Sequence, residues 1–303
     1  MVANKDQHWV PNSYLQAWAD PNRPRHHEPF IHLFNRHGGE HRRRNPKNVF
    51  NMPDLYTIFS GEERDLSLEQ HFGRLERDFV RVRGLIEIAD YGGASEVAAL
   101  YGFVAAMLAR PPHKIDDMKQ QWSSIVANAR TIRIDPEMRP IPSLGRGGPR
   151  LTLTEAQRMA DDPMGTWFPH SLNAHIRALS KLFGCDVLIN GSPHPFLTSD
   201  NPAVVYFPPI DVEVRRLPPP RGLGSRGCEI TLPISPTHAL LFTHKPPGIH
   251  DWLVLDWEGV FDINFRTITR ARTTIVSDRS DLFFVQTILE LVAEDTEEAP
   301  RGQ

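Results

Sequence analysis

Apolar residues recur every three or four positions through the middle of the chain, the spacing of one helical face. The clearest case is the segment 65–88, with apolar residues at Leu68, Phe72, Leu75, Phe79, Val82 and Ile86. Further helices are predicted over 97–108, which is almost wholly apolar, and over 115–132 and 168–183. We expect these helices to pack around the segment 97–108, which Pro111 and Pro112 end.

Short apolar runs broken by Pro, Gly, Asn and Ser lie on both sides of the helical region and predict strands. They fall mainly within residues 30–59 and 186–256, and a hairpin turn is expected at 36–41. A closing helix is predicted over 262–276. The pattern indicates an α+β fold, in which a helical core packs with a mixed or mainly antiparallel sheet.

The same pattern predicts one domain over residues 1–289. Its parts are an N-terminal arm and hairpin (1–60), a helical part (65–184), and a sheet with its closing helix (185–289). A loop rich in Pro and Gly is expected at 135–150. Residues 290–303 are acidic and predict a tail.

Composition narrows the class of protein. The 303 residues are 40% hydrophobic and 23% charged, which is ordinary for a globular domain. The net charge of −3 gives no general attraction to nucleic acid or to an anionic membrane. Cys185 and Cys228 are too few for a disulfide framework, and no signal segment or membrane span is recognised. We therefore expect a cytoplasmic protein without a membrane partner; the sequence leaves its oligomeric state open.

Candidate site residues come first from two distant segments. Asp200 and Asn201 lie in a short polar stretch between apolar runs, and Pro202 should break the strand there. His8 belongs to an aromatic N-terminal arm. We expect His8 and Asp200 to be near neighbours in the fold. The alternative is that His8 only anchors the arm.

Three further polar residues accompany predicted helices. Glu69 and Glu76 lie on one line beside the apolar stripe of 65–88, with Gly73 between them. They are roughly 10 Å apart along the axis, too far to chelate one ion unaided. They could flank a substrate or pair with separate arginines. Asn264 falls on an apolar stripe, where it either binds neighbouring backbone or faces a site.

Two basic segments could hold phosphate groups. The first, 36–47, includes Arg43, Arg44 and Lys47; the second, 215–226, includes Arg221. Solvated loops are the alternative explanation. Five histidines between residues 26 and 41 match no zinc spacing, and we interpret them as an exposed set carried by loops.

A resemblance joins these segments. The opening His8-Trp9-Val10-Pro11, followed by Tyr14, Leu15 and Trp18, resembles the start of DUF4238 proteins. Similar segments follow in the same order: the helix with Glu69 and Glu76, Thr198–Pro202, Leu232–Pro236, and the helix with Asn264. The basic segment 215–226 looks like an insertion. The resemblance implies that His8, Glu69, Glu76, Asp200, Asn201 and Asn264 belong to one site.

The leading hypothesis is an enzyme, specifically a hydrolase of a phosphate-bearing substrate such as a nucleotide or nucleic acid. His8 would carry protons, the carboxylates would serve acid–base chemistry, and Asn201 and Asn264 would orient the substrate. Glu76 and Asp200 are the candidate ligands of a divalent metal. The Glu-x-Lys pairing of many nucleases is missing, since Glu229 is followed by Ile and Thr. The alternatives are a non-catalytic binding or interaction protein, whose polar cluster is a buried structural network, and a tailoring enzyme for a small metabolite.

Overall fold

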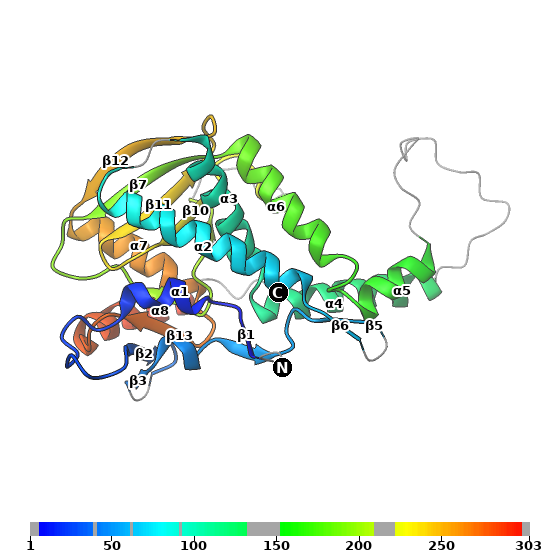
Figure 1. Ribbon diagram of the computed structural model, residues 1–303, viewed down its shortest axis with the longest axis horizontal. Coiled ribbons are helices and arrows are strands. Elements are labelled where there is room, and N and C mark those ends of the chain that lie inside the picture. Colours follow the sequence, from blue (N-terminus) through cyan, green and yellow to red (C-terminus); the bar gives the residue numbers. More distant parts are fainter. Residues whose placement is uncertain are drawn as a thin grey trace.

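The computed structural model describes residues 6–38, 41–60, 63–90, 93–131, 152–208 and 222–298. Within these, long helices pack beside a five-stranded sheet, and a smaller sheet lies below them in Figure 1. The central helices are α2 (Ser67–Glu87), α3 (Ala94–Ala109), α4 (Pro112–Thr131) and α6 (Phe168–Leu182). These are the predicted four, and the fold is α+β.

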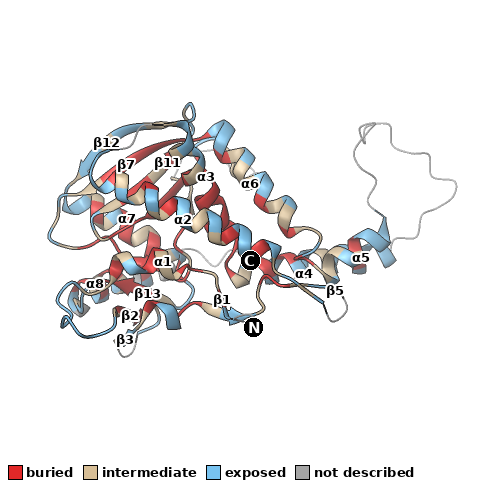
Figure 2. Cartoon of the chain, in the orientation of Figure 1, coloured by how far each residue is buried: buried red, intermediate tan, exposed pale blue. Residues whose placement is uncertain are grey.

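Helix α3 is the centre of the core. Its residues from Leu100 to Ala109 are all buried, which fits its almost wholly apolar sequence (Figure 2). The apolar stripe of α2 packs against it, and the rings of Phe79 and Phe103 stack with centroids 3.7 Å apart. Helical periodicity in the sequence therefore identified the core correctly.

The five-stranded sheet is mixed. In spatial order its strands are β12 (Ile249–Leu255), β7 (Gly184–Asn190), β11 (His238–Thr243), β10 (Glu229–Pro233) and β9 (Val204–Tyr206). Only the β12–β7 pair is parallel within the described strands of this sheet. Val187 and Phe242 belong to the core with α3, whereas Leu188 and Ala239 belong to the cluster with α7 (Trp257–Arg270). Helices thus cover both faces.

A second, four-stranded sheet is antiparallel. Its order is β3 (Arg42–Arg44), β2 (Ile31–Asn35), β13 (Thr274–Ser277) and β8 (Thr198–Ser199). The expectation that 30–59 and 186–256 build one sheet is therefore wrong. Besides β3, β2 pairs with β13, which comes from a segment predicted as the end of a helix. Helix α7 begins earlier, at Trp257, because the Asp256 side chain accepts the Gly259 N–H at 3.0 Å.

Shorter elements complete the fold. Two small ribbons pair β1 (Asp6–His8) with β4 (Asn51–Pro53), and β5 (Ile58–Ser60) with β6 (Glu63–Asp65). Single helical turns are α1 (Asn12–Leu15), η1 (Gln16–Trp18) and η2 (Pro46–Asn48), and α5 (Leu153–Asp161) is a short helix.

Helix α8 (Leu282–Glu298) packs on the second sheet and includes the start of the predicted acidic tail. The predicted loop 135–150 and Arg221 lie outside the described residues. Among the helices of the described chain, none combines the length and apolar character that crossing a membrane requires.

Candidate functional site

The N-terminal arm is bound to the body of the protein by three aromatic side chains. Trp9 Nε1 donates to the carbonyl of Asp200 at 3.1 Å, and Trp18 Nε1 donates to the carbonyl of Phe196 at 2.9 Å. Tyr14 Oη donates to the carbonyl of Pro233 at 2.6 Å. The arm therefore lies against the polar segment 198–202 and bonds to Asp200 through Trp9, the neighbour of His8 in the sequence. That His8 itself lies near Asp200 stays a prediction.

The Asp200 carboxylate binds the connection between α7 and β13. It accepts the backbone N–H groups of Arg272 and Thr273 at 2.8 Å each and that of Thr274 at 3.1 Å. The Thr273 hydroxyl adds a fourth bond at 2.9 Å. Asp200 is only 6% exposed. This carboxylate replaces the water that the three backbone amides would otherwise require.

The two candidate asparagines also bind backbone. Asn264 is fully buried; its Oδ1 accepts the Leu197 N–H at 2.7 Å, and its Nδ2 donates to the Pro195 carbonyl at 2.9 Å. Asn201 Nδ2 donates to the carbonyl of Arg270 at 3.0 Å. Together with Asp200 these residues fasten the β8 segment to α7 and β13, which is the geometry of a structural network.

A different polar cluster gathers around Arg110, directly after α3. Arg110 is 1% exposed, and its guanidinium donates to Glu76 Oε1 at 2.7 Å and, through Nη2, to the carbonyl of His8. The rings of Phe72 and Tyr56 lie 4.4 and 5.4 Å from it. Arg110 therefore joins α2 to the N-terminal arm. The one available sequence signal was a charged residue placed between a wholly apolar helix and Pro111.

Glu69 lies in the same cluster and lacks a comparable partner. Its Oε2 is buried without a hydrogen bond to any described residue. Burial raises the pKa of Glu69, the nearby Arg110 opposes that shift, and Glu76 adds to it. A carboxyl group that is hard to ionise thus lies beside an ionised pair. This combination is frequent at acid–base sites.

His8 forms the opposite edge of the cluster. Its Nε2 lies 3.1 Å from the Lys47 carbonyl and 3.5 Å from Asn51 Nδ2. Burial lowers the pKa of His8, and the repulsion from Arg110 adds to this effect, against the Lys47 bond and Glu76. Because a carbonyl only accepts, Nε2 carries the hydrogen in the neutral ring. Nδ1 is then the basic nitrogen.

The first basic segment adjoins His8 through Lys47. The Lys47 ammonium pairs with Glu28 at 3.0 Å, on the protein surface. Arg43 and Arg44 are exposed on β3, whose only strand neighbour among the described residues is β2, and Arg43 lies 5.4 Å from the Phe30 ring. The structure thus brings His8, Glu69, Glu76 and Lys47 to one region, whereas Asp200, Asn201 and Asn264 belong to the network at β8.

The two candidate metal ligands have other partners. Glu76 is paired with Arg110, and Asp200 with the three backbone amides. The described residues contain no group of three or more His, Cys, Asp or Glu side chains arranged to hold a metal ion. Both carboxylates are thus bonded to protein groups in this structure, and a metal at Glu76 and Asp200 stays a prediction.

Asp20, His32 and His41 form a hydrogen-bonded chain that the sequence did not predict. His32 Nε2 lies 2.8 Å from Asp20 Oδ2, and His32 Nδ1 lies 2.6 Å from His41 Nε2. His32 is 3% exposed on strand β2, so the interpretation of the histidines as an exposed, loop-borne set is wrong for it. Burial lowers the pKa of His41, and His32 and Arg43 add to this. The predicted hairpin held part of the signal, since it brings the strand with His32 beside the segment after the turn, where His32 lies opposite Arg43.

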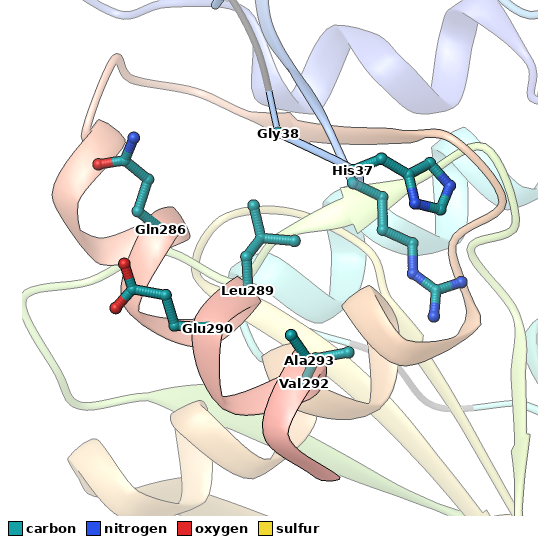
Figure 3. Close-up of a pocket in the computed structure, with 8 residues that line it drawn as sticks. His37, Gly38, Gln286, Leu289, Glu290, Val292 and Ala293 are labelled. Carbon is teal, nitrogen blue, oxygen red and sulfur yellow. The ribbon is translucent and has the colours of Figure 1, made fainter. Parts of the chain in front are cut away.

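A groove of about 620 Å³ lies between the β2–β3 turn and α8. Figure 3 shows His37 and Gly38 on one side and Leu289, Val292 and Ala293 on the other. None of the predicted site residues lines it. This groove therefore has no connection with the Arg110 cluster.

Comparison with known protein families gives a match over nearly the whole chain. The profile of DUF4238, described as a protein family of unknown function, matches residues 6–281. Neither the curated proteins nor the solved structures include a match. The matched range holds the aromatic arm, the Arg110 cluster and the Asp200 network. With nearly its whole length matched, the chain belongs to the DUF4238 family.

Proposed function

We propose that this protein is a hydrolase of a phosphate-bearing substrate, a nucleotide or nucleic acid, with His8 and Glu69 as its acid–base pair. The observation that carries the proposal is the buried, unpaired Oε2 of Glu69 beside Arg110. Burial raises the pKa of Glu69 and lowers that of His8, and these directions favour a protonated carboxyl group as the acid and a neutral imidazole as the base.

The two groups have complementary tasks. Neutral His8 accepts a proton at Nδ1 from the attacking water, while the water oxygen forms a bond to phosphorus. The bond from phosphorus to the leaving oxygen breaks, and protonated Glu69 gives its proton to that oxygen. Glu76 positions Arg110, whose positive charge limits how far the pKa of Glu69 rises.

The basic segment next to His8 supports the choice of a phosphate-bearing substrate. Arg43 and Arg44 are exposed, and Lys47 touches His8 through its carbonyl. Arginine forms bidentate hydrogen bonds with phosphate oxygens. Arg221 is proposed as a further contact. We place the reaction in the cytoplasm, where the buried thiols of Cys185 and Cys228 would stay reduced.

A non-catalytic binding protein is the second candidate. The observation in its favour is the Asp200 network, in which Asp200, Asn201 and Asn264 all bind backbone groups. If the Arg110 cluster has the same purpose, Glu69 and His8 only connect the arm to α2. Catalysis with simple phosphate esters separates the two candidates.

The test measures release of p-nitrophenol from bis(p-nitrophenyl) phosphate and p-nitrophenyl phosphate, with and without Mg²⁺ or Mn²⁺. We expect Glu69→Gln and His8→Asn each to lower the rate by about 10²–10⁴-fold. Asp78→Asn and His71→Asn are matched controls, because both residues are exposed on α2. They should keep the parent rate. A parent protein without activity, or variants as active as the controls, would reject the hydrolase and favour the binding protein.

A further inference from the structure

A second pocket lies apart from the Arg110 cluster, between the end of α3, α4, the start of α6 and β9. Its volume is about 250 Å³. This is below the usual range of roughly 300–1,000 Å³ for drug-sized ligands, so it suits a smaller molecule. His8, Glu69 and Glu76 do not line it.

The floor of the pocket is apolar. Leu108 and Ala109 from α3, Met118 from α4 and Val205 from β9 line it, and the first three of these are buried. Buried apolar side chains cannot hydrogen-bond a ligand. They favour an apolar group, whose transfer from water is worth about 25 cal/mol per Å² of surface.

The rim of the pocket carries one positive and one negative side chain. Lys114 and Asp117 are both exposed on α4, three positions apart. Residues at that spacing can pair, yet no ion pair within 4 Å joins them to each other or to any other part of the described chain. Both charges are therefore available to a ligand.

Two uncharged polar groups also line the pocket, one as an acceptor and one as a donor of hydrogen bonds. His175 Nδ1 lies 2.8 Å from the Ser171 carbonyl, one turn earlier in α6, so Nδ1 carries the hydrogen and Nε2 is an acceptor. Burial lowers the pKa of His175, and Lys114 adds to the shift against the Ser171 bond, so the neutral ring is favoured. The Ser171 hydroxyl can donate. The pocket thus offers donors in Lys114 and Ser171, and acceptors in Asp117 and His175.

We infer that this pocket binds a small zwitterion with an apolar side chain, that is, an apolar α-amino acid. Lys114 and Ser171 would hold the carboxylate, and Asp117 and His175 the ammonium group. The side chain would rest on Leu108, Met118 and Val205. One cation and one anion leave the lining without net charge, which matches a neutral zwitterion better than a phosphate dianion.

The test uses L-leucine as the probe, with binding to the full chain measured by isothermal titration calorimetry. Two analogues divide its charges: 4-methylpentanoate lacks the ammonium group, and isoamylamine lacks the carboxylate. We expect L-leucine to bind, and each analogue to bind at least about tenfold more weakly. No heat from L-leucine, or an analogue that binds as well as L-leucine, would overturn the inference.

Variants on α4 locate the site. Lys114→Met and Asp117→Asn should each weaken L-leucine binding by about tenfold or more. Lys119→Met and Asp116→Asn make the same chemical changes at exposed positions of α4 outside the pocket, and should leave binding unchanged. Equal effects in both pairs would overturn the inference. Failure here leaves the proposed hydrolase standing, because the two sites share no residue.

Discussion

At the residue scale, Arg110 decides how the other charges of its cluster behave. It is buried, and it bonds to Glu76 and to the His8 carbonyl. Desolvating an arginine costs free energy, which its carboxylate partner and the stacked rings of Phe72 and Tyr56 offset. Glu69 lies beside this pair without a hydrogen bond for its Oε2. The cluster therefore contains two different carboxyl groups. That of Glu76 is paired with Arg110, and that of Glu69 is buried with one oxygen lacking a hydrogen bond.

Glu69→Gln should raise the free energy of unfolding at neutral pH. The pKa of Glu69 in the folded protein lies above its ordinary value of 4.5. Its contribution to stability is therefore fully present below about pH 4.5 and is lost as the pH rises through the folded pKa. As the pH rises above 4.5, the unfolded chain releases this proton more readily than the folded protein does, which favours unfolding, and glutamine removes that difference. Urea unfolding of parent and variant at about pH 4 and about pH 8 checks this.

The gain from Glu69→Gln should be present at the higher pH and absent at the lower one. Asp78→Asn, at an exposed position of the same helix, should change stability by no more than about 0.5 kcal/mol at either pH. A variant that is less stable than the parent at both pH values would show that Glu69 stabilises the fold. Functional sites characteristically keep residues that lower the free energy of unfolding.

At the scale of elements, Asp200 determines where α7 ends and β13 begins. The helix stops at Arg270. After Ala271, the peptide N–H groups of Arg272, Thr273 and Thr274 bind the Asp200 carboxylate. The sequence predicted a helix over 262–276 because Ile268, Ala271 and Ile275 keep an apolar spacing. All three are buried in one cluster, although the last two lie beyond the helix.

Asp200→Asn should therefore destabilise the protein by about 2–4 kcal/mol, since an amide NH₂ would face backbone donors and leave some unpaired. Protection of the Thr273 and Thr274 amides from hydrogen exchange should fall with it. Asp116→Asn, at an exposed position of α4, is the control and should have little effect. If Asp200→Asn is as stable as the parent, Asp200 is not needed for the fold and stays a candidate site residue.

The sequence could predict the core because burial leaves a periodic record, as in α2 and α3. It could not predict the role of Asp200, whose partners are backbone amides that no residue type marks. It also missed Arg110, because a single charged residue has no periodicity. The likeness to DUF4238 did associate the arm with the segment 198–202, and the bond from Trp9 to Asp200 joins them. Its implication that Asn264 shares a site with His8 stays a prediction.

At the scale of the whole molecule, α8 packs onto a hydrophobic cluster formed with the four-stranded sheet and the end of α7. Phe284, Val285, Ile288 and Val292 of this helix pack with Leu197 and Ile275. The acidic residues from Glu290 onward thus begin within a packed helix. Because Val292 is 5% exposed, its side chain contributes to the cluster in spite of its acidic surroundings.

Removing residues 290–303 should lower the free energy of unfolding by about 1–3 kcal/mol, through the loss of the Val292 side chain and of the last helical turns. Thermal unfolding should show a fall of a few degrees, about 2–4 °C per kcal/mol for a domain of this size class. Chains ending after Gly302 serve as the comparison. An unchanged melting temperature in the shorter chain would mean that the end of α8 adds nothing to the cluster.

The attachment of the N-terminal arm has a consequence for synthesis in the cell. The partners of Trp18, Tyr14 and Trp9 lie 178, 219 and 191 residues further along the chain. At about 5–20 residues per second, a ribosome needs roughly 10–40 s to make them after the arm has emerged. Throughout that interval Trp9, Tyr14 and Trp18 lack these hydrogen-bond partners. The arm is therefore made well before its partners, and its three bonds to the body can form only after residue 233 has been made.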